Sequence, residues 1–382
     1  MRILFFANTD WYLYNFRLSL FKALRDSGHD VLLISPPGPY GKKLQELGFD
    51  WIPAPMDRRS LNPLKELALV WWLIRLMRSR SVTVVHGFTI KCALYAAISA
   101  RLTRVPARVS AVTGMGYVYT SRDGKAKLLQ PLVSMLMKLA LGGKNSRLIL
   151  QNQDDFDFFE KNHLVDADQI RLIRGSGVDC SAYAPKSHHH ADNAELKNFT
   201  VLLAARMLWD KGIKEYVAAA RILLAEGRDI QFMLAGDPDL GNPASVPEEC
   251  LRRWDHEKII RWIGHSDNMP SLLRDVDIFV LPSYREGLPK GLIEAGACGL
   301  PLVTTDAPGC REVVTNGVEG LIVPVESVGL LAEAIARLHD DVPMRKQCGI
   351  AARAKVLKEF DERIVISRTM AVYEELLKDR ML

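Results

Sequence analysis

The chain has 382 residues, of which 48% are hydrophobic and 25% are charged, and its formal net charge is +5. This composition is typical of globular proteins and excludes a disordered chain, a collagen and a small disulfide-stapled domain. The length suits two domains, and the six cysteines, none of them in Cys-x-x-Cys pairs, favour a reducing cytosol over a zinc or dithiol site.

Short apolar runs alternate with helix-length segments through residues 1–182. The first two residues lead directly into a strand-like run at 2–7, which predicts that no secretory signal peptide precedes the fold. Further strands are expected at 30–35, 50–53, 82–85, 109–112, 147–151 and 170–173, with helices at 16–27, 41–47 and 64–78. This alternation predicts a mostly parallel sheet covered by helices on both faces.

The alternation breaks at 175–185, and a polar segment with His188, His189 and His190 follows. We expect a solvated linker over 183–198. Strands are expected again at 200–204, 230–235, 259–263, 278–281, 301–304 and 320–323, with a helix at 212–226. The predicted architecture is α/β, with doubly wound domains at 1–182 and 199–361 and a closing helix in 362–382 that packs back on the first domain.

The most informative segment is Glu286-Gly-Leu-Pro-Lys-Gly-Leu-Ile-Glu294, which follows the apolar run at 278–281. In a strand–loop–helix context, Gly287 lets the backbone approach a ligand, and the start of the helix offers free N–H groups. Glu286 and Glu294 could then accept hydrogen bonds from two hydroxyl-bearing rings of one ligand. The alternative is two glutamates on an exposed helix surface.

A second segment, Arg206-Met-Leu-Trp-Asp-Lys211, directly follows the strand expected at 200–204. Ligands of doubly wound sheets bind beyond the carboxyl ends of the strands. Two cations at that place can neutralise a diphosphate, Arg206 through its planar fork and Lys211 as a point charge. The alternative is a pair of solvated loop cations.

Together these two segments resemble the retaining glycosyltransferases of family 4, which have the GT-B fold of two Rossmann-like domains facing across a cleft. The similarity continues through Gly236-Asp237 and Gly264, and it extends to the N-terminal half, from the opening strand to the helix that carries Arg17 and the Ser60-Leu-Asn-Pro63 stretch. It is greatest to bacterial transferases that add N-acetylgalactosamine or related hexosamines to undecaprenyl-diphosphate-linked sugars.

The resemblance implies a role for each of these residues. Arg206 and Lys211 would hold the donor diphosphate and stabilise the leaving nucleotide. Glu294 would bind the ribose hydroxyls, and Glu286 would hold the transferred sugar. The remaining donor-binding positions implied are Gly287 and Leu288 beside the sugar, and Trp262, Ile263 and Gly264 beside the base.

The implied reaction is transfer from a UDP-sugar with retention at the anomeric carbon, in which a diphosphate oxygen takes the acceptor proton. We expect no metal ion and no cofactor, because the two cations would already neutralise the diphosphate. Four Asp-x-Asp pairs match a metal-binding pattern, which shows how often the pattern arises by chance: Asp155 with Asp157, Asp166 with Asp168, Asp237 with Asp239, and Asp275 with Asp277.

Candidates for acceptor binding or for the cleft come from the N-terminal half. The family's N-domain histidine normally follows the strand expected at 109–112, where this sequence has Thr113 and Gly114. His86 ends the preceding strand and is a candidate substitute, with a buried strand-end histidine as the alternative. The cations expected to receive an acceptor diphosphate, with plain surface charge as the alternative, are Lys91, Arg58 and Arg59.

The charge is concentrated in the first half of the chain. Residues 1–150 carry 22 Lys and Arg against 8 Asp and Glu, which indicates an anionic partner. Residues 64–80 and 125–144 combine apolar faces with flanking cations, as in peripheral docking on anionic lipid, although core helices with a solvated edge are the alternative. With no membrane-spanning stretch in the sequence, we expect a cytoplasmic protein, peripheral on the inner face of the cell membrane.

The expected function is transfer of a hexosamine or hexose, with N-acetylgalactosamine favoured, from a UDP-sugar to an undecaprenyl-diphosphate-linked sugar in bacterial surface-glycan or glycoprotein-glycan assembly. A nucleotide-sugar epimerase of the same fold is one alternative, and it would need no sugar acceptor. A basic nucleic-acid-binding protein is the other. No motif that reads RNA or DNA accompanies the charge, so no nucleic-acid partner is expected.

Overall fold

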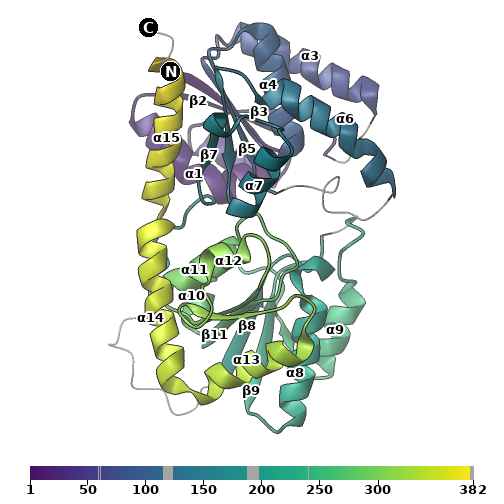
Figure 1. The fold of residues 1–382 in the computed structure, drawn as a ribbon, viewed down its shortest axis with the longest axis vertical. Helices are drawn as coiled ribbons and strands as arrows, with labels where there is room; N and C mark the ends of the chain where they lie inside the picture. Colours follow the sequence, from purple (N-terminus) through teal and green to yellow (C-terminus); the bar gives the residue numbers. More distant parts are fainter. Residues whose placement is uncertain (59, 61, 115–123, 187–197, 240, 379–382) are drawn as a thin grey trace. The chain divides into compact units, whose positions relative to one another are not determined.

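The computed structural model describes residues 1–378 except 59, 61, 115–123, 187–197 and 240. It divides into two compact units, Met1–Ser176 with Arg363–Leu382, and Gly177–Glu362. Each unit contains one parallel sheet with helices on both faces (Figure 1). The predicted α/β class and doubly wound sheets are therefore confirmed.

The chain passes into the second unit at Gly177, earlier than the boundary expected after residue 182. Val178 and Cys180 already pack in the core of the second unit, where Val178 N donates a hydrogen bond to Phe360 O at 3.0 Å. These contacts place residues 177–182 in the second unit. The break in the strand–helix pattern of the sequence suggests a later boundary, after residue 182. Most of the linker expected at 183–198, including His188, His189 and His190, lies outside the described residues.

The sheet of the first unit has seven parallel strands in the order β3-β2-β1-β4-β5-β6-β7. The strands are β1 (Arg2–Phe6), β2 (Asp30–Ser35), β3 (Asp50–Pro53), β4 (Val84–Phe88), β5 (Ala107–Val112), β6 (Ser146–Leu150) and β7 (Ile170–Leu172). Residue Ile3 pairs with Val31 on one side and with Val84 on the other. The strand order therefore reverses between β1 and β4.

Two sets of helices cover this sheet. One face is covered by α1 (Asp10–Asp26), α2 (Pro39–Glu46) and the C-terminal α15 (Glu362–Lys378). The other is covered by α3 (Pro63–Ser79), α4 (Ile90–Thr103), α6 (Gly124–Leu141) and α7 (Gln153–Lys161). The C-terminal helix belongs to the first unit because Tyr373 and Leu376 share its aromatic core with Phe5 and Phe21.

Helices α3 and α6 both pack on α4 (Figure 1), and each also exposes apolar side chains away from the core. The exposed apolar side chains are Leu64, Leu67 and Trp71 on α3, and Leu128, Leu132, Met135 and Leu139 on α6. These spacings of three and four residues place each set on one face of its helix. Within the described part of the chain, every helix is too short or too polar to cross a lipid bilayer.

The sheet of the second unit has six parallel strands in the order β10-β9-β8-β11-β12-β13. The strands are β8 (Phe199–Ala204), β9 (Ile230–Ala235), β10 (Arg261–Trp262), β11 (Ile278–Leu281), β12 (Leu302–Thr305) and β13 (Gly320–Val323). Alternate residues of β8 face opposite sides, Val201 and Leu203 to one and Leu202 to the other. Both faces are therefore buried, as the continuous apolar runs predict.

The helices of the second unit again form two layers. One layer contains α8 (Ile213–Ala225), α9 (Glu248–His256) and α13 (Val328–Asp340). The other contains α10 (Met269–Arg274), α11 (Lys290–Ala297), α12 (Cys310–Val313) and α14 (Val342–Glu359). The strand order of this sheet reverses between β8 and β11, and ligands of such sheets bind beside that reversal.

Candidate functional site

The carboxyl ends of β8 and β11 lie side by side where the strand order of the second sheet reverses. Arg206 and Lys211 follow β8, and Glu286 follows β11. The structure therefore brings three of the predicted site residues to one edge of one sheet, in loops carried by neighbouring strands.

The two loops are braced backbone to backbone. Tyr284 N donates to Asp210 O at 2.9 Å, and the Ser283 hydroxyl donates to the same oxygen at 3.0 Å. Gly212 has φ +73°, and a Cβ there would lie 2.1 Å from Pro282 O. Only glycine permits both the left-handed conformation and this approach, so the position of Lys211 is tied to that of the β11 loop.

Lys211 and Glu286 form an ion pair across these loops. Lys211 Nζ donates to Glu286 Oε1 at 2.7 Å, and the two side chains are only 12% and 15% exposed. Within the described residues, Glu286 alone accepts a hydrogen bond from this ammonium group, which has three N–H donors. Two donors at the carboxyl edge are therefore available to a ligand oxygen.

Arg206 is paired with a different acid from the one that holds Lys211. Its guanidinium donates to Asp239 Oδ2 at 2.9 Å, and Asp239 lies in the loop after β9. The Arg206 side chain is 58% exposed, so its charge faces solvent at the same edge of the sheet. This cation is thus oriented by a neighbouring loop and not buried.

Glu294 lies in the second turn of α11, and its side chain is 12% exposed. Lys290 Nζ approaches its carboxylate at 3.5 Å, and the Tyr183 hydroxyl hydrogen-bonds with it. Burial raises the pKa of Glu294, although Lys290 and Tyr183 both oppose that shift. Gly291 brings the start of this helix against β8, because a Cβ there would lie 3.3 Å from Ala204 O.

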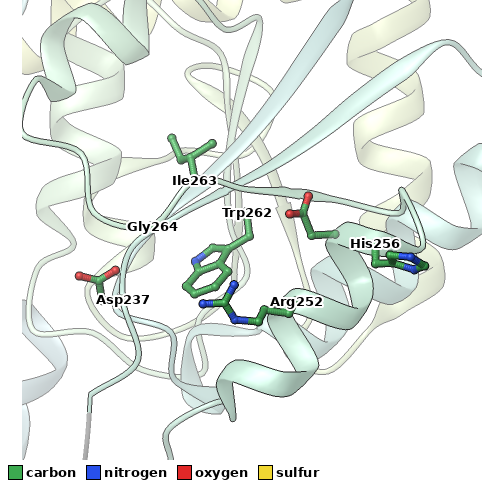
Figure 2. Close-up of a pocket in the computed structure, with 7 residues that line it drawn as sticks. Asp237, Arg252, His256, Trp262, Ile263 and Gly264 are labelled. Atoms are coloured by element: carbon green, nitrogen blue, oxygen red, sulfur yellow. The ribbon is translucent and has the colours of Figure 1, made fainter.

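Trp262 and Gly264 line a hollow of about 490 Å³ together with Asp237, Arg252 and His256 (Figure 2). The Trp262 indole N–H donates to Gly236 O at 2.9 Å, and the Arg252 guanidinium lies over the indole ring. Ile263 also borders this hollow, but its side chain points away from the indole toward the other face of the sheet (Figure 2). Of the three residues that the resemblance assigned to the base, Trp262 and Gly264 thus face this hollow, and the side chain of Ile263 faces away from it.

Gly287 and Leu288 occupy the half-buried turn between Glu286 and α11. Gly309, with φ +79°, closes over this turn, since a Cβ there would lie 2.7 Å from Glu286 O and 2.8 Å from Gly287 O. Cys310 lies beneath it, and burial raises the pKa of its thiol to about 12. The thiol is therefore protonated at neutral pH and supplies no nucleophile here.

His86 does not face an acceptor, which corrects the sequence-based expectation. It lies in the middle of β4 and not at the strand end, and its side chain is buried between Phe5, Phe88 and Tyr373. Its Nδ1 lies 2.6 Å from the Tyr373 hydroxyl. Burial, reinforced by the nearby Arg17 charge, holds the pKa of His86 well below its usual value, so the ring is neutral.

Lys91 also forms its hydrogen bonds within the fold and has no N–H donor left for an acceptor phosphate. Its ammonium donates to Asp57 O and Ser60 O at 2.9 Å and to Glu66 Oε1 at 2.8 Å. These three acceptors match the three donors of the group. The expectation for Lys91 is therefore corrected to a clamp that joins the loop before α3 to α4.

Within the described part of the first unit, the structure shows no binding role for the other candidate acceptor-binding residues. Arg58 is an exposed residue of the loop before α3, and Arg59 lies outside the described residues. Thr113 and Gly114 are half-buried directly after β5, and a Cβ at Gly114 would meet nothing within 4 Å. The segment that follows them is not among the described residues.

Three residues that the sequence analysis missed hold the site residues in place: Asp239 on Arg206, and Tyr183 and Lys290 on Glu294. Asp239 was noticed only as half of an Asp-x-Asp pair. Within the described residues, no three His, Cys, Asp or Glu side chains gather in a way that could hold a metal ion. No signal in the residue types identifies Asp239, because its contact with Arg206 depends on β9 lying beside β8.

Comparisons with known proteins agree with this geometry. Residues 2–153 match the family described as glycosyl transferase 4-like, and residues 186–355 match the glycosyl transferases group 1 family. A relative from Campylobacter jejuni is 30% identical over 99% of this chain and 100% of its own length. It is named N,N'-diacetylbacillosaminyl-diphospho-undecaprenol alpha-1,3-N-acetylgalactosaminyltransferase.

A second relative, the UDP-Gal:alpha-D-GlcNAc-diphosphoundecaprenol alpha-1,3-galactosyltransferase of Escherichia coli, is 26% identical over 79% of this chain and 78% of its own length. Among solved structures, Anabaena HepE in complex with UDP and glucose superposes with a TM-score of 0.80 at 20% identity, covering 98% of this chain and 99% of HepE. The predicted GT-B fold, with two Rossmann-like domains, is thereby confirmed.

Proposed function

The chain belongs to the glycosyltransferases of group 1, and we propose that it transfers a hexosamine or hexose from a UDP-sugar to an undecaprenyl-diphosphate-linked sugar in bacterial glycan assembly. N-acetylgalactosamine is the favoured sugar. The support is the name of the Campylobacter jejuni relative, together with a second relative that is named for a diphosphoundecaprenol acceptor.

The observation that carries this proposal is the ammonium group of Lys211 at the carboxyl edge of β8, which uses one of its three N–H donors within the described part of the fold. With two N–H donors available and Arg206 following the same strand, the edge offers positive charge to a leaving diphosphate. Negative charge on that diphosphate grows as the bond to the sugar breaks. The two cations therefore act preferentially in the transition state and raise turnover more than they raise donor affinity.

In the proposed reaction, the bond between the anomeric carbon and the β-phosphate oxygen breaks while the acceptor hydroxyl oxygen bonds to the same face of that carbon. The acceptor proton passes to the departing phosphate oxygen, so configuration is retained without a protein base. Glu286 would accept hydrogen bonds from the transferred sugar while Lys211 holds its carboxylate. Arg206 and Lys211 would do the electrostatic work here without a metal ion or cofactor.

We also propose that α3 and α6 dock the protein on an anionic membrane at the cytoplasmic face, where the lipid-linked acceptor resides. Both helices expose an apolar stripe although they also contribute to the core, and Arg75 lies 4.5 Å over the exposed Trp71 ring. Apolar stripes flanked by cations are typical of helices that lie in a membrane interface.

Vesicle flotation tests the docking. Leu132→Glu with Met135→Glu on α6 is expected to abolish binding to vesicles containing anionic lipid. Ile350→Glu, at an exposed apolar position on α14 of the second unit, should bind as the unaltered protein does. Equal binding by all three proteins would contradict docking through α6, and binding to oligonucleotides but not to vesicles would favour the nucleic-acid alternative.

The transferase activity is tested by measuring nucleotide release over a panel of nucleotide sugars, with and without undecaprenyl-diphosphate-linked sugars. We expect release of UDP that requires the lipid-linked acceptor, and a product of retained configuration by NMR. Interconversion of nucleotide sugars without any acceptor would instead identify an epimerase and overturn the proposal.

A further inference from the structure

The loop after β9 forms a brace along the segment that carries Arg206. Met207 N donates to Asp237 O at 3.0 Å, and Val246 N donates to Met207 O at 2.8 Å. Trp209 N donates to Ala244 O at 2.8 Å. Backbone hydrogen bonds thus hold the two loops together on both sides of Asp239.

The carboxylate of Asp239 is itself fixed within this brace. Asn242 donates to it through Nδ2 at 3.1 Å, and Asn242 N donates to Asp239 O at 2.9 Å. The Asn242 side-chain oxygen Oδ1 in turn accepts from Ala244 N at 3.1 Å. With a side chain only 17% exposed, Asp239 presents a stationary acceptor to its neighbours.

Arg206 differs from Asp239 in its freedom. Its side chain is 58% exposed, and a long exposed arginine ordinarily samples many rotamers. Asp239 Oδ2 accepts a hydrogen bond from one terminal nitrogen of Arg206 at 2.9 Å. A guanidinium has five N–H donors in a rigid plane, so this contact through Nη1 restrains the side chain and leaves the edge formed by Nε and Nη2 for a bidentate contact.

We propose that Asp239 is a positioning residue that aims Arg206 at the departing diphosphate. The inference rests on the proposed function, because it requires Arg206 to act on that group. The charge of Asp239 repels a diphosphate, so its carboxylate weakens donor binding while it orders the cation. Removal of the carboxylate therefore lowers kcat without raising the KM for the donor.

A double-mutant cycle tests this assignment. Asp239→Ala is expected to lower kcat about tenfold, the scale of ordering one long side chain. In the Arg206→Ala background, Asp239→Ala should cause no further loss, because the residue it positions is gone. Asp239→Asn keeps an oxygen acceptor and should recover part of the turnover. Asp340→Ala, which removes one of the two acids paired with the half-buried Arg228, is the matched control and should not change the kinetics.

Each failure has its own signature. Losses that add in the double variant would show that Asp239 acts independently of Arg206 and would overturn the inference, as would higher turnover in Asp239→Ala. Unchanged turnover in Arg206→Ala would instead overturn the role of Arg206 in the proposed function. Urea unfolding of every variant separates these outcomes from loss of folded protein.

Discussion

Each unit of the molecule contains a half-buried lysine–carboxylate pair beside its sheet, and the two pairs are nearly identical in themselves. Lys91 lies 2.8 Å from Glu66 in the first unit, with side chains 20% and 14% exposed. Lys211 lies 2.7 Å from Glu286 in the second, with side chains 12% and 15% exposed. Distance and burial therefore do not distinguish a site residue from a clamp.

The difference lies in the donors that remain. Lys91 also donates to two backbone carbonyls, which saturates its ammonium group, whereas Glu286 is the one acceptor of Lys211 among the described residues. A buried cation whose donors are all hydrogen-bonded stabilises the fold, and one with donors left over can bind a ligand oxygen. Lys211 of the second unit thus retains N–H donors for a ligand, whereas the donors of Lys91 in the first unit are all used within the fold.

Alanine substitutions at the two lysines should separate these roles most clearly. Lys211→Ala is expected to lower kcat by about 10²–10³-fold, because one preorganised cation at the leaving group is lost. Lys91→Ala removes three charge-assisted hydrogen bonds and should lower the free energy of unfolding by about 3 kcal/mol. Steady-state kinetics and urea unfolding of both variants make the measurement.

The matched comparison guards against a trivial explanation. Lys211→Ala breaks a single ion pair and should destabilise less than Lys91→Ala does, so its loss of turnover cannot be attributed to unfolding. If Lys91→Ala, measured per folded molecule, lost as much turnover as Lys211→Ala, the division between clamp and site would be wrong.

Two left-handed glycines of the second unit sharpen the role of the loop brace. An alanine at Gly212 would press its Cβ against Pro282 O, whereas at Gly227, with φ +77°, it would meet nothing within 4 Å. Both variants bear the strain of alanine at positive φ, about 1 kcal/mol. Gly212→Ala should lose a further amount of about 2 kcal/mol from overpacking and also lose turnover, because the brace positions Lys211.

Thermal unfolding and kcat of the two glycine variants provide the test. Gly227→Ala should have unchanged kcat, since that residue lies after α8 and away from the carboxyl edge. Equal stability and equal turnover of the two variants would show that contact between the loops does not position the site.

Much of the fold could be predicted from the sequence because most of the strands are buried on both faces. The strands that coincide with their predictions are β2, β3, β9, β11 and β13. Their apolar runs, interrupted in β9 by Gln231, are bounded by polar, glycine or proline residues. Helix α1 begins at Asp10, before the residue 16 expected from the apolar pattern, because the Thr9 side chain caps it by accepting from Tyr12 N. A polar cap ahead of the apolar stripe carries no periodic signal.

The site was predictable only where it is local. Arg206, Lys211 and Glu286 lie in loops directly after apolar runs, so a strand–loop pattern identifies them. The partner of Arg206 depends on β8 lying beside β9, and the saturation of Lys91 depends on the carbonyls of Asp57 and Ser60. Neither a sheet neighbour nor a backbone oxygen is visible in the residue types.

Glu294 extends the comparison to a buried acid. Because its pKa is raised in the fold, ionised Glu294 disfavours folding at neutral pH, and this penalty disappears as pH falls below its ordinary value of 4.5. Glu294→Gln should therefore raise the melting temperature at pH 7 and leave it unchanged at low pH. The same variant should bind UDP about tenfold more weakly, since the second acceptor oxygen of the carboxylate is replaced by an NH2 group that cannot accept from a ribose hydroxyl.

Calorimetric titration with UDP over a range of pH completes that test. In the unaltered protein, affinity should begin to fall at a pH above 4.5, when the buried carboxylate becomes protonated. Unchanged UDP affinity in Glu294→Gln would separate Glu294 from nucleotide binding and would leave its burial without a function.

His86 provides the smallest effect and the counterpart in the first unit. Its pKa is lowered in the fold, so the stability gained by burying the neutral ring is present above pH 6.5 and is lost as pH falls, when the unfolded chain takes up the proton. The double variant His86→Phe with Tyr373→Phe removes both hydrogen-bonding partners in place of one. It should flatten the acid-side fall in unfolding free energy and leave turnover at neutral pH unchanged. Lost turnover in a folded double variant would show that His86 takes part in the reaction. It would also contradict the contrast between the two units, in which the polar groups of the first unit are paired within the fold and those of the second unit remain available to a ligand.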